Sequence, residues 1–112
     1  MGDRSQIAIK QDGKNRVYLY GHWLGNPTEV LRSALIRGKG RWTDTEYLTR
    51  IIFCEMVKGH EMDETGFGIG TEKHGDIEHP IPVLDCDKQT ISWELTDNPA
   101  GSMTFAEFCK QP

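Results

Sequence analysis

The chain has 112 residues, a formal net charge of −4 at pH 7 and 37% apolar residues. A chain of this length predicts one domain. Its longest apolar run, residues 51–54, is far shorter than the ~20 residues that a membrane span requires, and residues 1–4 lead into a strand pattern instead of a signal peptide. We therefore expect one domain over residues 1–112 that is cytoplasmic and has no membrane span.

Charge is divided unevenly along the chain. Residues 1–59 contain ten Lys or Arg and six Asp or Glu, whereas residues 60–112 contain three and eleven. This division favours complementary surfaces that associate between copies, or an anion site in the first half. The three cysteines, Cys54, Cys86 and Cys109, show no C-x-x-C spacing. We expect buried thiols in a reducing compartment, not disulfides, zinc ligands or a catalytic nucleophile.

The first pattern in chain order is a β-hairpin. Two alternating runs, residues 6–10 and 16–23, are separated by Asp12-Gly13, a dipeptide typical of two-residue turns. Alternation predicts two groups of side chains on opposite faces of the second strand: Val17, Leu19 and Trp23, and Tyr18, Tyr20 and His22.

Two helices are predicted next. A capping box from Asn26 to Glu29, with proline in the first turn, starts the first helix, and Gly38 ends it. A second capping box, Thr43 to Glu46, starts a helix that ends at residues 58–59. The apolar residues at helical spacing that should face the core are Val30, Leu31, Ala34 and Leu35 in the first helix and Tyr47, Leu48, Ile51, Ile52 and Met56 in the second.

Strand patterns return after residue 64 and are followed by one more helix. The strands cover residues 65–71, 81–85 and 89–95, and the last two form a hairpin. The inward residues of its second strand are Ile91, Trp93 and Leu95. A capping box from Thr104 to Glu107 starts a terminal helix anchored by Phe105 and Phe108. The order ββαα-βββ-α indicates the α+β class, with a mainly antiparallel sheet and the helices packed on one face.

Glycine alternates with larger residues in the strand at residues 65–71. Gly66, Gly68 and Gly70 therefore share one face and leave it without side chains. Because glycine weakens a strand, the repeat needs a reason. The reason that we expect is a helix or tryptophan of the same chain packed there, and the functional hypothesis is a floor for a ligand ring or partner chain. The repeat does not open a helix after a strand, which excludes a dinucleotide-binding fingerprint.

A basic linker joins the two predicted helices. Arg37, Lys39 and Arg41 are interleaved with glycine and precede Trp42. Cations, exposed backbone N–H groups and the start of the second helix suit a phosphate, and the Trp42 ring suits a base. The alternative is an ordinary solvated turn between helices. The basic stretch is too small in this acidic chain to predict extended nucleic acid as a partner.

Histidines and carboxylates gather after residue 59. The segment from His74 to His79 matches no established metal-ligand spacing, so we expect exposed loop residues and no metal or cofactor. His22 with Tyr20 could act as an acid–base pair. No spacing of a nucleophile and a base supports an enzyme.

Four segments resemble a group of small proteins from phages and their bacterial hosts. The segments are Arg4-Ser5-Gln6-Ile7-Ala8-Ile9, Val17-Tyr18-Leu19-Tyr20-Gly21-His22-Trp23, Tyr47-Leu48-Thr49-Arg50-Ile51-Ile52-Phe53 and Glu64-Thr65-Gly66-Phe67-Gly68-Ile69. The resemblance implies a small cytoplasmic protein that antagonises host defences, either as a sponge for a nucleotide signal or by blocking a defence protein. It assigns no catalytic or binding residue.

Three functional hypotheses follow. The first is a non-catalytic homo-oligomer that sequesters a small anionic, nucleotide-like ligand in a pocket between subunits. Its ligand-binding residues are Arg37, Lys39 and Arg41 at the phosphate, Tyr20, His22, Trp23 and Trp42 near the base, and Gly66, Gly68 and Gly70 as the floor. The second is an inhibitor that engages a host protein through an acidic surface of Glu61, Asp63, Glu64, Glu72, Asp76 and Glu78. The third is a small hydrolase or deaminase.

Overall fold

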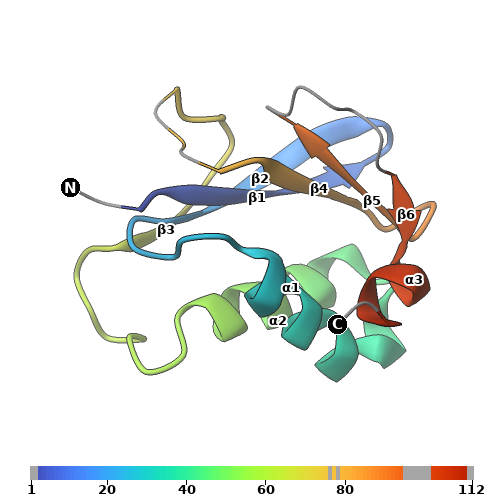
Figure 1. Ribbon diagram of the computed structural model, residues 1–112, viewed down its shortest axis with the longest axis horizontal. Helices are drawn as coiled ribbons and strands as arrows, with labels where there is room; N and C mark the ends of the chain where they lie inside the picture. The colour runs from blue at the N-terminus through green and yellow to red at the C-terminus, as the bar shows by residue number, and fades with distance from the viewer. Residues whose placement is uncertain (1–2, 76, 78, 95–101, 111–112) are drawn as a thin grey trace.

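The computed structural model describes residues 3–75, 77, 79–94 and 102–110. Six strands form one mixed sheet in the order β3-β2-β1-β4-β5-β6, and three α-helices lie together on one side of it (Figure 1). The elements are β1 (Ser5–Gln11), β2 (Lys14–Gly21), α1 (Thr28–Arg37), the 3₁₀ turn η1 (Lys39–Arg41), α2 (Thr45–Met56), β3 (Phe67–Gly70), β4 (Ile81–Asp85), β5 (Thr90–Glu94), β6 (Met103–Thr104) and α3 (Phe105–Lys110).

The predicted α+β class and mainly antiparallel sheet are confirmed. Strands β1 and β4 pair in parallel, and the other described neighbours pair antiparallel. The predicted order is only partly right. A short sixth strand, β6, lies just before α3, and the 3₁₀ turn η1 lies between α1 and α2. The glycine strand is also shorter than predicted, covering Phe67–Gly70. Leu95 lies outside the described residues.

The first hairpin turns where its sequence predicts. Asp12 and Gly13 have φ angles of 55° and 77°, the left-handed conformation that a two-residue hairpin turn requires. Strand β2 ends at Gly21, however, two residues earlier than predicted. Trp23 is therefore not part of the inner face of this strand, and its side chain is 64% exposed.

Two of the three predicted helices begin one residue later than expected. Pro27 is the N-cap residue of α1, but the Asn26 side chain still accepts a hydrogen bond from the Thr28 N–H at 3.0 Å, as predicted for a capping asparagine. The carboxylate of Asp44, not the Thr43 hydroxyl, caps α2 by accepting a hydrogen bond from the Tyr47 N–H at 3.1 Å. The third capping box is confirmed, since Glu107 accepts from the Thr104 N–H at 2.9 Å. This hydrogen bond holds the pKa of Glu107 below its ordinary value.

The main core lies between the helices and the sheet. Phe105 and Phe108 of α3 are 0% and 1% exposed, as predicted. Tyr47 is not a core residue, because its side chain is 52% exposed. The other buried members from the helices are Leu31, Ala34, Leu35, Leu48, Ile52 and Met56, and those from the sheet are Ile7, Ile9, Leu19, Leu84 and Ile91.

A second, smaller cluster lies on the opposite face of the sheet. It contains Ala8, Tyr18, Ile81 and Val83, with Ile77 packed against it. Strands β2 and β1 separate β3 from β4 in the sheet, so the connection from β3 to β4 must cross these two strands. This crossing, on the face without helices, positions the candidate site described below.

No helix within the described residues is long and apolar enough to cross a membrane. The longest one, α2, has 12 residues, whereas a spanning helix needs ~20.

Gly21→Ala should destabilise the fold at the end of β2. A Cβ at Gly21 lies 2.7 Å from Cβ of Leu24, so the turn after β2 must move to admit a methyl group. We expect the free energy of unfolding, measured by urea denaturation, to fall by about 1–3 kcal/mol. Gly40→Ala is the matched control, because a Cβ there meets no described atom within 4 Å. Equal losses in the two variants would contradict the crowding at Leu24.

Candidate functional site

A hollow of about 230 Å³ lies beside strand β3 on the face of the sheet opposite the helices. The side chains of Leu19 and Ile7 point to the helices, so by alternation those of Tyr18, Tyr20 and Gln6 point to this face. We call the hollow the glycine pocket. The residues that line it are Gln6, Tyr18, Tyr20, Gly68, Ile69, Gly70 and His74.

Glycine keeps the floor of this pocket open. In the ladder between β2 and β3, Gly68 stands opposite Tyr20, and Gly70 stands opposite Tyr18. A Cβ at either glycine meets no described atom within 4 Å. The expectation that a helix or tryptophan of the same chain packs against these glycines is therefore wrong. The third glycine, Gly66, has a φ of 99° at the turn into β3, which a side chain would strain.

Gln6 fixes the wall of the glycine pocket. Its side chain is buried at 1% exposure in strand β1. The Gln6 Nε2 donates to the carbonyl of Glu72 at 3.2 Å, and its Oε1 accepts from the backbone N–H of His74 at 3.0 Å. The amide thus uses both of its polar atoms to hold the connection after β3, as a neighbouring strand would.

Aromatic rings continue from this wall to the end of β2. The His74 and Tyr20 rings are stacked, with centroids 4.8 Å apart and planes at 24°. The Tyr20 hydroxyl lies 3.0 Å from Nδ1 of His22. The His22 ring then meets Trp23 edge to face, with centroids 4.6 Å apart. The structure therefore brings together Tyr20, His22 and Trp23 and adds His74 to the row.

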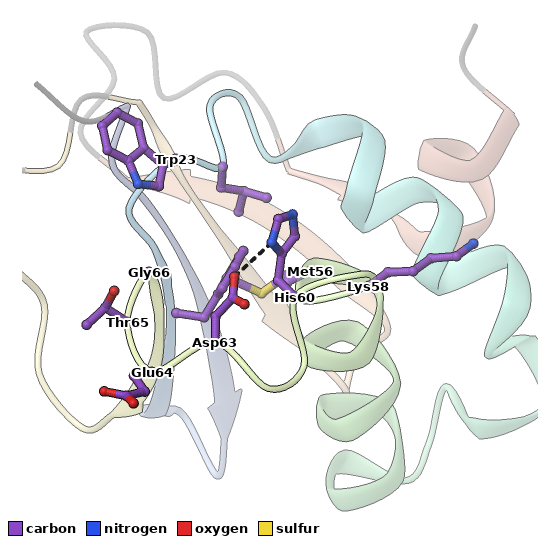
Figure 2. Close-up of a pocket in the computed structure, with 10 residues that line it drawn as sticks. Trp23, Met56, Lys58, His60, Asp63, Glu64, Thr65 and Gly66 are labelled. Carbon is purple, nitrogen blue, oxygen red and sulfur yellow. Dashed lines mark hydrogen bonds and ion pairs between the residues drawn. The ribbon is translucent and has the colours of Figure 1, made fainter.

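A larger hollow of about 600 Å³ opens between the turn after β2 and the segment after α2. We call it the loop cleft; Figure 2 shows Trp23 on one side and the His60–Asp63 pair facing it across the opening. The Nδ1 atom of His60 and the Oδ2 atom of Asp63 are 2.9 Å apart. Charges of both signs line the cleft, because Lys58 is joined there by Asp63 and Glu64. A phosphate therefore finds no concentration of positive charge in it.

The basic linker does not reach either hollow. Its residues Lys39 and Trp42 line a separate apolar hollow of about 210 Å³ against α3. Helix α3 directly follows β6, which is the edge strand opposite to β3 (Figure 1). The predicted phosphate residues and the predicted floor thus lie at opposite edges of one copy.

Three side chains of the linker, those of Arg37, Arg41 and Trp42, already have partners. Arg37 forms an ion pair with Glu55 at 3.0 Å, and the guanidinium of Arg41 lies over the Tyr47 ring at 5.1 Å. The Trp42 ring packs against Phe105 and donates its Nε1–H to the carbonyl of Leu35 at 2.9 Å. These contacts support the alternative interpretation of a structural turn.

The start of α2 is also unsuited to an anion. The carboxylate of Asp44 occupies the N-terminal cap, which places a negative charge where a phosphate was expected. In the linker, the Gly38 and Arg41 N–H groups donate to the carbonyls of Ala34 and Gly38. Both contacts make this helix end less favourable for an anion than its sequence suggests.

The remaining titratable groups are dispersed. Within the described part of the chain, no three His, Cys, Asp or Glu side chains lie close enough to hold a metal ion. Cys86 is buried as predicted, and burial raises its thiol pKa, whereas Cys54 is exposed. The acidic residues Glu61, Asp63, Glu64 and Glu72 are all exposed. Asp76 and Glu78 lie outside the described residues.

Four residues that line the glycine pocket were not among the predicted ligand-binding residues: Gln6, Tyr18, Ile69 and His74. Gln6 stands in an apolar strand pattern, and His74 is the exposed loop residue that was expected, with a ring that also stacks on Tyr20. A polar residue next to a core run was the available signal for Gln6, but its partners lie 66 and 68 positions away. Only the crossing of the connection over the sheet brings them together.

Comparisons with protein-family models, with curated proteins and with solved structures found no match to this chain. No family and no activity are carried over from another protein. The glycine pocket and the row of aromatic rings beside it are therefore the features that support a function.

Proposed function

We propose that the protein is a non-catalytic binding protein that captures a planar, nitrogen-containing ring, such as the base of a nucleotide-like ligand, in the glycine pocket. One observation carries this proposal: the side-chain-free strip of Gly68 and Gly70 is open beside the stacked Tyr20 and His74 rings. A strand tolerates this loss of packing only poorly, so an external group that uses the space gives the repeat a purpose.

The chemistry of the walls suits such a ring. Its flat face can approach the peptide planes of β3 closely, because Gly68 and Gly70 have no side chains to prevent it. The Tyr20 and His74 rings offer aromatic contact. The Tyr20 hydroxyl supplies a polar group for a ring nitrogen, and the buried Gln6 amide holds the wall beside it in place.

A ligand ring in the glycine pocket does not bring its phosphate into contact with the basic linker of the same copy. Arg37, Lys39 and Arg41 were expected to bind it, but the linker lies at the opposite edge from the glycine pocket. The ring therefore provides the recognition, and any phosphate extends from the pocket. Together with the resemblance to small phage proteins, capture of this kind would serve to remove a nucleotide signal from the host cytoplasm.

Gly68→Val tests the proposal. The valine side chain fills the space above the floor, so we expect the affinity for adenosine or guanosine, or their monophosphates, to fall at least tenfold in calorimetric titration, or ~1.4 kcal/mol. The melting temperature should be unchanged or higher, because no described atom crowds the new Cβ and valine suits a strand.

Gly40→Val is the matched control for this titration. Its Cβ also meets no described atom within 4 Å, but Gly40 lies in the linker between α1 and α2. It should leave binding intact. Failure of all these compounds to bind the wild-type protein would refute the proposal, and their conversion to a product would instead support a hydrolase or deaminase.

A second candidate function is an inhibitor that binds a host protein through the acidic surface. Residues 61–64 are all exposed, and Met62 among them is 93% exposed, a combination that suits contact with a basic partner protein. A complex with a host protein that weakens strongly as salt is raised, in the absence of nucleoside binding, would favour this inhibitor over the first proposal.

A further inference from the structure

Strand β3 is an edge strand whose hydrogen-bonding direction is fixed by its neighbour. It is the first strand in the sheet order and pairs only with β2 among the described strands. The carbonyl of Gly66 accepts from the N–H of His22 at 2.7 Å, so this carbonyl points toward β2. By alternation, the backbone N–H and C=O groups of Gly68 and Gly70 also point to β2. Those of Phe67 and Ile69 point to the open edge of the sheet.

This edge lacks the charged residues and prolines that often prevent pairing. Residues 65–71 contain no charge and no proline. The Ile69 side chain is 64% exposed on the helix side of the sheet, opposite the buried Leu19 in the ladder. An uncovered, uncharged strand with an exposed isoleucine predicts a partner strand.

We propose that a second copy of this chain pairs antiparallel with β3 at this edge, in a register centred on Gly68, and that the two copies together complete the ligand site. In this register Phe67 of one copy faces Ile69 of the other, and both pairs exchange their outward N–H and C=O groups. The strand is thus its own complement, as a two-fold interface requires. The shared ligand site rests on the proposed function, whereas the pairing of the edges rests on the strand alone.

The two faces of the paired strands explain the alternating sequence. On the helix side, the Phe67 and Ile69 side chains form two apolar cross-strand pairs that cover the exposed isoleucine. On the other side, Gly68 of one copy meets Gly68 of the other, so the side-chain-free strip continues across the axis. A hollow of about 230 Å³ is small for a ligand pocket, but two of them joined reach the range of ~300–1,000 Å³ that such pockets occupy.

Charge is compatible with self-pairing of this strand. An isologous interface places each side chain near its own type, so a charge within the ladder would be opposed by the same sign. The paired residues include no charged side chain. The nearest charge before the strand is that of Glu64, and the φ of 99° at Gly66 places this residue outside the strand. A strand of four residues is short, however, and stable dimers bury ~1,200–2,000 Å². We therefore expect a weak dimer that a ligand bound across both copies strengthens.

A cysteine at the centre of the interface tests the register. Facing residues of a non-hydrogen-bonded antiparallel pair have Cα atoms ~4.5 Å apart, within the range that a disulfide spans. In a Cys54→Ser background, which removes the exposed native thiol, Gly68→Cys should form a covalent dimer on mild oxidation. Gly40→Cys in the same background should remain mainly monomeric. Equal cross-linking of the two variants would overturn the register.

Ile69→Lys tests the interface without a disulfide. The substitution places a positive charge in each of the two apolar cross-strand pairs. Lysine on an edge strand commonly prevents that strand from pairing with another chain. Sedimentation over a wide concentration range should show dimer formation by the wild type and by the control Met62→Lys, but not by Ile69→Lys, with unchanged circular dichroism in all three. A wild type that stays monomeric with and without nucleoside, or a dimer that survives Ile69→Lys, would overturn the inference. Dimer formation without nucleoside binding would keep the interface and refute only the shared ligand site.

Discussion

Phe105→Ala should produce the largest loss of stability among single substitutions in this protein, about 3–5 kcal/mol in the free energy of unfolding. The Phe105 side chain is 0% exposed, and its ring meets Trp42 edge to face with centroids 5.5 Å apart. The Phe105 N–H also donates to the carbonyl of Gln89 at 2.9 Å, which ties the start of α3 to the β4–β5 turn. Truncation leaves a cavity at the point where the terminal helix joins the linker and the sheet.

The measurement is chemical denaturation followed by circular dichroism, because a loss of this size is comparable to the whole stability of many small domains. Phe53→Ala on α2 is the matched control, since the same atoms are removed from a side chain that is only half-buried. We expect the control to lose clearly less stability. Equal losses in the two variants would show that α3 does not close the core in the way that the burial of Phe105 indicates.

The elements that sequence patterns predicted well are those fixed by local chemistry. The Asp12-Gly13 turn needs two positive φ angles, which few dipeptides adopt, and the apolar spacing of α1 identifies its buried face. The errors also have local causes. Adjacent Thr43 and Asp44 are both good N-caps, and only the structure shows that the carboxylate reaches the Tyr47 N–H. The two-residue β6 is too short to leave a periodic pattern.

The sequence predicted only part of the candidate site. The strand residues follow from local alternation, whereas the contacts of the basic linker depend on residues distant in the chain. Alternation along β2 and β3 placed Tyr20 and the glycines on their faces without any knowledge of the fold. In the basic linker, the sequence could not reveal the contacts that its cations make with distant residues. Glu55 pairs with Arg37, and Tyr47 lies under Arg41. No spacing along the chain reveals that a cation is already neutralised.

Gln6→Leu should weaken binding to the glycine pocket at least tenfold while leaving most of the fold intact. Leucine preserves the volume of the buried side chain but cannot hold the carbonyl of Glu72 or the N–H of His74. The His74 ring then loses its fixed position over Tyr20, and the wall of the pocket opens. Because both backbone groups lie in exposed residues, water can satisfy them, so we expect the free energy of unfolding to fall by only about 1–3 kcal/mol.

The variant Gln11→Leu is the control that separates the loss of the two Gln6 hydrogen bonds from a general effect of replacing glutamine by leucine in β1. Gln11 is the exposed last residue of the same strand, and its replacement removes the same amide far along β1 from the pocket. Nucleoside affinity, measured by calorimetric titration, should fall at least tenfold in Gln6→Leu and stay at the wild-type level in Gln11→Leu. Native amide exchange should rise at His74 in the first variant alone, because only there does the N–H lose its acceptor. Unchanged affinity together with faster exchange at His74 would mean that the wall is ordered by Gln6 but is not part of the ligand site.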